Sequence, residues 1–98
     1  MQVSVRDKRL KALDNEPPPN SVPGLQPGVV VKIRVIISVL RAAVDLPTAG
    51  DAHPEWRLHQ WKGKSGTWSI DVSGSTRLLF DYDKKAKAVS GMVYDDPH

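Results

Sequence analysis

Residues 67–82, TWSIDVSGSTRLLFDY, decide the fold of this chain. Every second residue of 67–72 is apolar, and this alternation is typical of a strand that buries one face. The residues SGS at 73–75 favour a short loop, and the aliphatic and aromatic residues of 76–82 favour a second strand. The stretch therefore predicts a β-hairpin.

Strands are also expected on both sides of this hairpin. Residues 55–62 precede it and are joined to it by a turn at 63–66 that contains two glycines. A polar turn at 83–87 leads to a last strand at 88–94. The C-terminal half of the chain is therefore expected to form a four-stranded antiparallel meander.

The longest apolar pattern lies in residues 27–44, PGVVVKIRVIISVLRAAV. Its run of β-branched residues would also suit a buried strand. The apolar residues nevertheless recur at the spacing of one helical face, and the basic residues lie mostly off that face. This periodicity favours a helix of about four to five turns.

The other N-terminal segments are shorter. We expect a strand at 2–6, a short helix at 7–13 that Asp7 can cap, and a proline-rich loop at 15–24. Neither side of this loop is long enough to fold alone, so residues 1–98 are expected to form one domain. The predicted fold class is α+β, with the N-terminal strand and two helices packed on a mainly antiparallel sheet of four to five strands.

Composition narrows the possible chemistry. The chain has no cysteine, which excludes disulfides, a thiol nucleophile and a cysteine-based zinc site. It also lacks the acidic or histidine clusters typical of metal sites, so we expect neither a metal nor a cofactor. No apolar run approaches the roughly 20 residues that cross a bilayer, and the first residues do not resemble a secretory signal. We therefore expect a cytoplasmic protein with no membrane partner.

Charge is unevenly distributed along the chain. The formal net charge is +3, but residues 56–77 hold four basic side chains against the single acidic Asp71, and acidic stretches flank them. A basic strip between acidic margins suits a polyanion such as nucleic acid. Fluctuations of this size are also common in ordinary solvent-exposed segments, which is the alternative interpretation.

The run RLHQWKGKSGTWSIDVSGSTRLLF, together with the final DDPH, resembles the HigB toxins of the RelE/ParE superfamily. These are the toxin halves of bacterial type II toxin–antitoxin modules. The residues that stand at the positions of the family pattern are Trp61, Lys62, Gly63, Gly66, Trp68, Ser69, Ile70, Val72, Thr76, Arg77, Leu78, Phe80, Asp96 and His98. The chain departs from the pattern at Pro97, where the family usually carries Tyr, and also in having Thr76 for an aromatic residue and Trp61 for Leu. The resemblance implies a RelE-like fold.

The resemblance also implies an activity, that of a ribosome-dependent endoribonuclease which cuts mRNA in the decoding site and inhibits translation. In this reaction a ribose 2′-hydroxyl attacks the adjacent phosphate and expels the 5′-oxygen of the next nucleotide. It needs a base, an acid and a cation for the charged phosphorane, but no metal. The implied partners are the ribosome with its mRNA, a cognate helix-turn-helix antitoxin, and operator DNA through the antitoxin complex only.

Four catalytic residues follow from the resemblance. Arg77 would bind the phosphate and stabilise the transition state. His98 and His59 are the candidates for acid and base, and Asp96 would orient one of them. Each has a plainer alternative: an ordinary cross-strand ion pair of Arg77 with Asp71, a half-buried strand histidine, and solvated groups at the chain end.

Further cations are expected to contact RNA, namely Lys62, Lys64 and Arg57. Alternation along the predicted strand places His59 and Lys62 on opposite faces. Both can then reach one site only if the strand bulges or ends before Lys62. The three tryptophans could stack on bases or belong to the core.

Two other functions are open from the sequence. One is a non-catalytic or inactivated protein of the same fold, which poisons gyrase or only binds an antitoxin. Pro97 favours this loss of activity, whereas Arg77, Lys62 and His98 together argue against a gyrase poison. The other is a small RNA- or DNA-binding regulator. The sequence lacks a helix-turn-helix or aromatic RNA-binding motif, and this argues against such a regulator.

Overall fold

The computed structural model describes residues 1–14, 19, 21–62 and 66–96, and structural statements are confined to them. The predicted α+β class is confirmed. The elements in chain order are β1 (Gln2–Val5), α1 (Lys8–Lys11), a 3-10 turn (Ala12–Asp14), α2 (Pro27–Ala42), α3 (Leu46–Ala52), a second 3-10 turn (Pro54–Trp56), β2 (His59–Gln60), β3 (Thr67–Asp71), β4 (Arg77–Asp83) and β5 (Ala88–Asp95).

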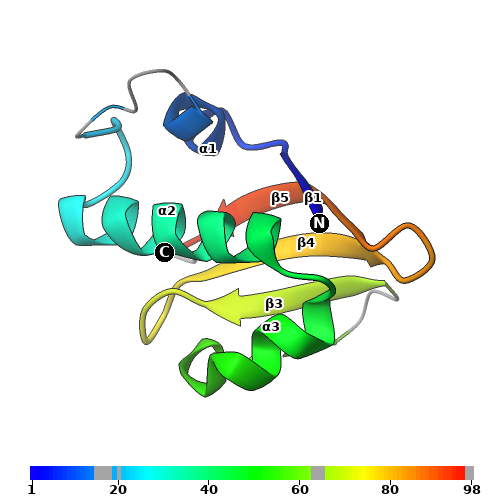
Figure 1. Ribbon diagram of the computed structural model, residues 1–98. Helices are drawn as coiled ribbons and strands as arrows, with labels where there is room; N and C mark the ends of the chain where they lie inside the picture. Colours follow the sequence, from blue (N-terminus) through cyan, green and yellow to red (C-terminus); the bar gives the residue numbers. More distant parts are fainter. Residues whose placement is uncertain (15–18, 20, 63–65, 97–98) are drawn as a thin grey trace.

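The strands form one open sheet in the order β1-β5-β4-β3-β2 (Figure 1). β1 runs parallel to β5, and all other neighbouring strands are antiparallel. In the β3–β4 hairpin Asp71 faces Arg77, as a loop at 73–75 predicts. The N-terminal strand therefore occupies one edge of the sheet and the very short β2 occupies the other.

The helix predicted from residues 27–44 is confirmed as α2, which lies across one face of the sheet (Figure 1). Its apolar stripe joins the apolar side chains of β3, β4 and β5 in the core, and its buried residues are Val30, Ile33, Ile36, Ile37 and Leu40. The helix ends at Ala42 because the backbone of Ala43 is extended. No helix within the described ranges is long and apolar enough to cross a membrane.

A third helix, α3, follows α2 where the sequence pattern predicts none. The carboxylate of Asp45 accepts the Thr48 N–H at 2.8 Å and so caps its first turn. Pro47 cannot extend the preceding helix, and its fixed φ angle and missing N–H suit the first turn of a new helix. The same proline therefore separates two helices.

The strand predicted over 55–62 is wrong in length. β2 contains only His59 and Gln60, because Pro54 begins a 3-10 turn and Arg57 adopts a left-handed conformation with φ 50° and ψ 46°. A residue in that conformation interrupts an extended strand. Arg57 therefore lies in a turn rather than in a strand.

A bulge in β5 sets which of its side chains reach the core. The register of β5 with β4 shifts between Leu79 and Asp81, and its register with β1 shifts between Val3 and Val5. Gly91, which has φ +64°, supplies the extra residue in a conformation that other residues rarely adopt. As a result Val89 and Met92 are both buried although they are three residues apart.

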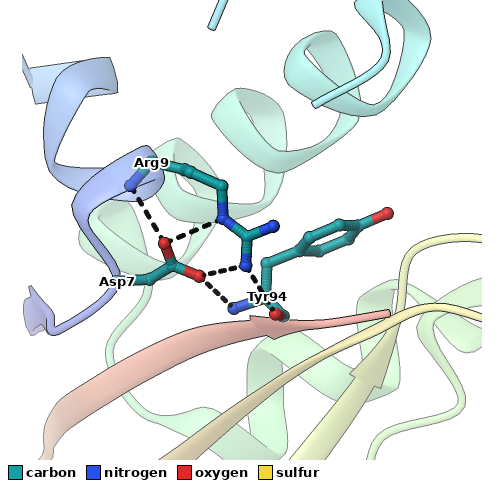
Figure 2. Close-up of polar contacts among 3 residues, drawn as sticks. All are labelled: Asp7, Arg9 and Tyr94. Carbon is teal, nitrogen blue, oxygen red and sulfur yellow. Dashed lines mark hydrogen bonds and ion pairs between the residues drawn. The ribbon is translucent and has the colours of Figure 1, made fainter. Parts of the chain in front are cut away.

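The predicted short helix at 7–13 appears as α1 and the 3-10 turn after it, and Asp7 caps it as expected. The Asp7 carboxylate accepts hydrogen bonds from the Arg9 N–H at 2.9 Å, from the Arg9 guanidinium at 2.7 and 3.0 Å, and from the Tyr94 N–H at 3.1 Å (Figure 2). Arg9 also donates to the Tyr94 carbonyl oxygen at 3.1 Å. This network ties the start of α1 to the end of β5.

Candidate functional site

The candidate site lies on the face of the sheet opposite α2. Along β4 the buried Leu78 points into the helix-covered core, so its neighbour Arg77 points to the other face. Strand pairing places Asp71 and Asp95 on either side of Arg77 on that face. The three side chains form a row of one cation between two carboxylates.

Trp61 covers part of this face. It directly follows β2, and its N–H donates to the Thr67 carbonyl oxygen at 2.7 Å. The guanidinium carbon of Arg77 lies 4.7 Å from the centroid of the indole ring, which is a cation–π arrangement. The Arg77 side chain is 26% exposed, so the stack holds the cation at the surface.

Among the described residues, the carboxylate nearest to Arg77 belongs to Asp95, with 3.7 Å between Arg77 Nε and Asp95 Oδ2. Asp71 faces Arg77 in the register, but its carboxylate lies 3.7 Å from Nε of Arg57. The alternative in which Arg77 pairs with Asp71 is therefore replaced by a pair with Asp95. Sequence reasoning did not find Asp95, although the antiparallel register of β4 and β5 is the signal that places it there.

Lys62 shares a groove with Trp61. A cavity of about 260 Å³ opens beside the indole, and Arg6, Leu79 and Val93 also line it. β2 ends at Gln60, so strand alternation does not apply to Lys62. Because the strand ends before Lys62, the side chains of Lys62 and His59 can lie on the same face of the sheet. Arg6 is a further cation that sequence reasoning did not single out.

His59 stands next to this groove. It pairs with Ser69 across β2 and β3, and its ring centroid lies 6.5 Å from that of Trp61. Its Nδ1 lies 2.6 Å from the carbonyl oxygen of Arg57. A carbonyl oxygen can only accept, so Nδ1 donates this hydrogen bond, and in the tautomer with its proton on Nδ1 the other ring nitrogen, Nε2, is an acceptor.

Asp96 directly follows β5, and its charge acts on Arg9 of α1. Hydrogen bonds to Asp7 are the main cause that raises the pKa of Arg9, and the negative charge of Asp96 adds to this effect. Arg9 itself lies over the Tyr94 ring, with its guanidinium carbon 5.3 Å from the centroid. The structure thus brings Arg77, Trp61, Lys62 and His59 together on one face, and places Asp96 near Arg9.

Two predicted site residues, His98 and Lys64, lie outside the described residues, as does Pro97. Within the described ranges, no three of the His, Asp and Glu side chains gather closely enough to hold a metal ion. Of the other tryptophans, Trp56 is buried in the core and Trp68 packs against it. Trp61 is therefore the tryptophan on the candidate face.

Fold and site together define a small α+β protein whose open sheet face carries a stacked arginine, a lysine-lined groove and an accessible imidazole. Comparison with protein-family models and with curated proteins gave no match. The likeness to the HigB toxins therefore rests on the residues quoted from the sequence.

Proposed function

We propose that this chain is the toxin of a type II toxin–antitoxin module with a RelE-like fold. In this proposal it acts in the cytoplasm as a metal-independent endoribonuclease that cuts mRNA on the ribosome. The observation that carries the proposal is the placement of Arg77, stacked on Trp61, on the same face as the imidazole of His59.

Arg77 has the features that a phosphate-binding cation needs. Stacking on an indole engages the flat face of a guanidinium and leaves its N–H donors, which lie in the plane, free to bind oxygen atoms. The distance of 3.7 Å to Asp95 is longer than a hydrogen bond, so a phosphate can replace this carboxylate at little cost. Lys62 and Arg6 in the adjacent groove would contact neighbouring phosphates.

The chemistry proposed for this face is transesterification. The ribose 2′-oxygen bonds to phosphorus as its proton passes to Nε2 of His59, and Arg77 stabilises the charge of the phosphorane. The bond to the 5′-oxygen then breaks, and that oxygen takes a proton from a second acid. The products are a 2′,3′-cyclic phosphate and a 5′-hydroxyl. The resemblance makes His98 the other acid–base candidate, to which we assign the second proton transfer, and it gives Asp96 an orienting role.

The proposed partners come from the same resemblance. The ribosome would present the mRNA, and Arg57 and Lys64 would add contacts to its phosphates. A cognate helix-turn-helix antitoxin would neutralise the protein and would bring it to operator DNA. Arg57 is 79% exposed in the structure, which is compatible with a contact to a large partner.

Induced expression in bacteria tests the proposal. We expect the wild type to arrest growth and to cleave translated messages, as mapped by primer extension, and Arg77→Ala and His59→Ala to do neither. Arg34→Ala is the matched control, because Arg34 is an exposed cation on α2. Growth arrest by all four proteins would contradict the assigned site. Intact messages with broken DNA would favour a gyrase poison instead.

A further inference from the structure

A second cavity lies on the other face of the sheet, away from Arg77. Its volume is about 540 Å³, and it opens between α3, the segment that follows it, and the strands β3 and β4. It shares no lining residue with the groove beside Trp61. Its volume falls within the range of roughly 300–1,000 Å³ that is typical of small-molecule sites. The proposed cleavage chemistry makes no use of it.

Close contacts hold the walls of this cavity in place. A Cβ atom on Gly50 would lie 2.5 Å from Cδ2 and 3.3 Å from Cβ of Leu58, so a larger residue there would require the Leu58 side chain to move. The Leu46 N–H donates to the hydroxyl oxygen of Tyr82 at 3.3 Å, which ties the start of α3 to β4. The cavity is therefore formed before any ligand binds, which lowers the entropic cost of binding.

The surface of the cavity has two chemical parts. Trp68, Tyr82 and Leu58 give it an aromatic and aliphatic lining. Lys84 and Lys87, from the turn between β4 and β5, stand at its rim. The first part suits a flat apolar ring, and the second suits an anion attached to that ring.

Three other charged residues line the cavity, namely Arg57, Asp45 and Asp51. The Asp45 carboxylate is occupied as the cap of α3, and its hydrogen bonds with Thr48 are the main cause that lowers its pKa. The charge of Lys87, which lines the same cavity, lowers this pKa further. Lys84 makes no ion pair with any described residue and is the cation most available to a ligand.

We propose that this cavity binds a nucleotide, with the base against Trp68 and Tyr82 and the phosphate at Lys84 and Lys87. Every base presents a π-face to an aromatic side chain, and such stacking is worth about 1–3 kcal/mol per base. A purely apolar ligand would leave the lysine rim unused, and inorganic phosphate would leave the aromatic lining unused. The nucleotide could be free or part of a single RNA strand, and the chemistry of recognition is the same.

Titrations followed by NMR on the full-length protein test this site. The probes are adenosine 5′-monophosphate, adenosine, and ribose 5-phosphate, and the indole signal of Trp68 is identified with a Trp68→Phe variant. We expect the monophosphate to shift the signals of Trp68 and Tyr82, adenosine to bind more weakly, and ribose 5-phosphate to leave these two signals unchanged. A shift of the Trp61 signal, on the opposite face, reports separately on the phosphate site proposed at Arg77.

Matched variants separate the two parts of the site. Replacing both lysines, Lys84→Ala and Lys87→Ala, should weaken the monophosphate about tenfold, to the level of adenosine. The control pair, Lys8→Ala and Lys11→Ala on α1, removes the same charge away from the cavity and should change nothing. Thermal denaturation of each variant shows whether a change in binding comes from altered folding.

Three outcomes would overturn the proposal. Equal affinity for ribose 5-phosphate would mean attraction by surface lysines alone, and equal affinity for adenosine would mean an apolar cavity alone. Shifts at Trp61 without shifts at Trp68 would place binding on the other face.

A tetranucleotide that binds more tightly than the monophosphate would identify RNA as the source of the nucleotide, and the reverse order of affinities would identify a free nucleotide. Mononucleotide binding does not depend on mRNA cleavage, so this proposal and the proposed function can fail separately.

Discussion

Two arginines approach the end of β5 from opposite faces of the sheet, and they are held in different ways. Arg9 binds the Asp7 carboxylate at 2.7 and 3.0 Å and the Tyr94 carbonyl oxygen at 3.1 Å (Figure 2). Arg77 rests on Trp61 and lies 3.7 Å from the carboxylate of Asp95. Among the described residues, Arg9 thus makes short hydrogen bonds to the protein, whereas Arg77 has the indole ring and one longer ion pair.

The difference separates a structural ion pair from a cation that can bind a ligand. Short charge-assisted hydrogen bonds around the nearly buried Asp7 side chain, which is 10% exposed, stabilise the fold. A longer pair at a partly exposed site contributes little to stability. Its partner can therefore be exchanged for a phosphate. The following predictions test this distinction.

The largest effect is expected for Arg77→Ala on cleavage of ribosome-bound mRNA. Loss of the cation that stabilises the phosphorane should lower kcat about 100-fold or more. The free energy of unfolding should change by less than about 1 kcal/mol, because the pair with Asp95 is long. Single-turnover cleavage and urea denaturation measure the two quantities. A large loss of stability together with the loss of activity would make Arg77 a structural residue.

The second effect concerns Asp7→Ala, which should lower the free energy of unfolding by about 2–3 kcal/mol. The substitution leaves the Arg9 guanidinium and the N–H groups of Arg9 and Tyr94 without their acceptor. Urea denaturation of the variant measures the loss. Asp95→Ala is the control on the other face and should cost much less. Similar losses in both variants would contradict the distinction between the two arginines.

The Asp7 network should also make stability depend on pH. Burial raises the pKa of Asp7, but the hydrogen bonds from Arg9 and Tyr94 lower it by more, so the net value lies below 3.8. A carboxyl whose pKa is lowered by folding contributes stability above its unfolded pKa and loses it as pH falls through the folded value. The stability advantage of the wild type over Asp7→Asn should therefore shrink below about pH 4. Thermal unfolding between pH 7 and pH 2 measures it, and an advantage that grows on acidification would contradict the sign.

The smallest effect is expected for Arg57→Ala. Its side chain is 79% exposed and its distance to Asp71 is 3.7 Å, so the unfolding free energy should change by less than about 0.5 kcal/mol. If Arg57 contacts an RNA phosphate, KM for ribosome-bound mRNA should rise a few-fold with kcat unchanged, and the salt dependence of binding should decrease. A change in kcat instead would place Arg57 among the reacting groups.

The sequence by itself determined the elements whose patterns are local. The hairpin over 67–82, its register of Asp71 against Arg77, and helix α2 all follow from periodicity and loop length, and the structure confirms them. Prolines mislead the same reasoning, because a proline ends one element and also suits the first turn of the next. Helix α3 was missed and β2 was overextended for this reason.

Which charged side chains form ion pairs was decided only by the tertiary structure. Two carboxylates flank Arg77 in the sheet, and the pair goes to Asp95 because the left-handed turn at Arg57 brings another cation to Asp71. Likewise, the end of β2 at Gln60 lets Lys62 join the groove of Trp61, and the packing of α3 near Leu58 and Tyr82 leaves a cavity between these segments. These arrangements depend on where separate segments pack in space, and no repeating pattern along the chain encodes that.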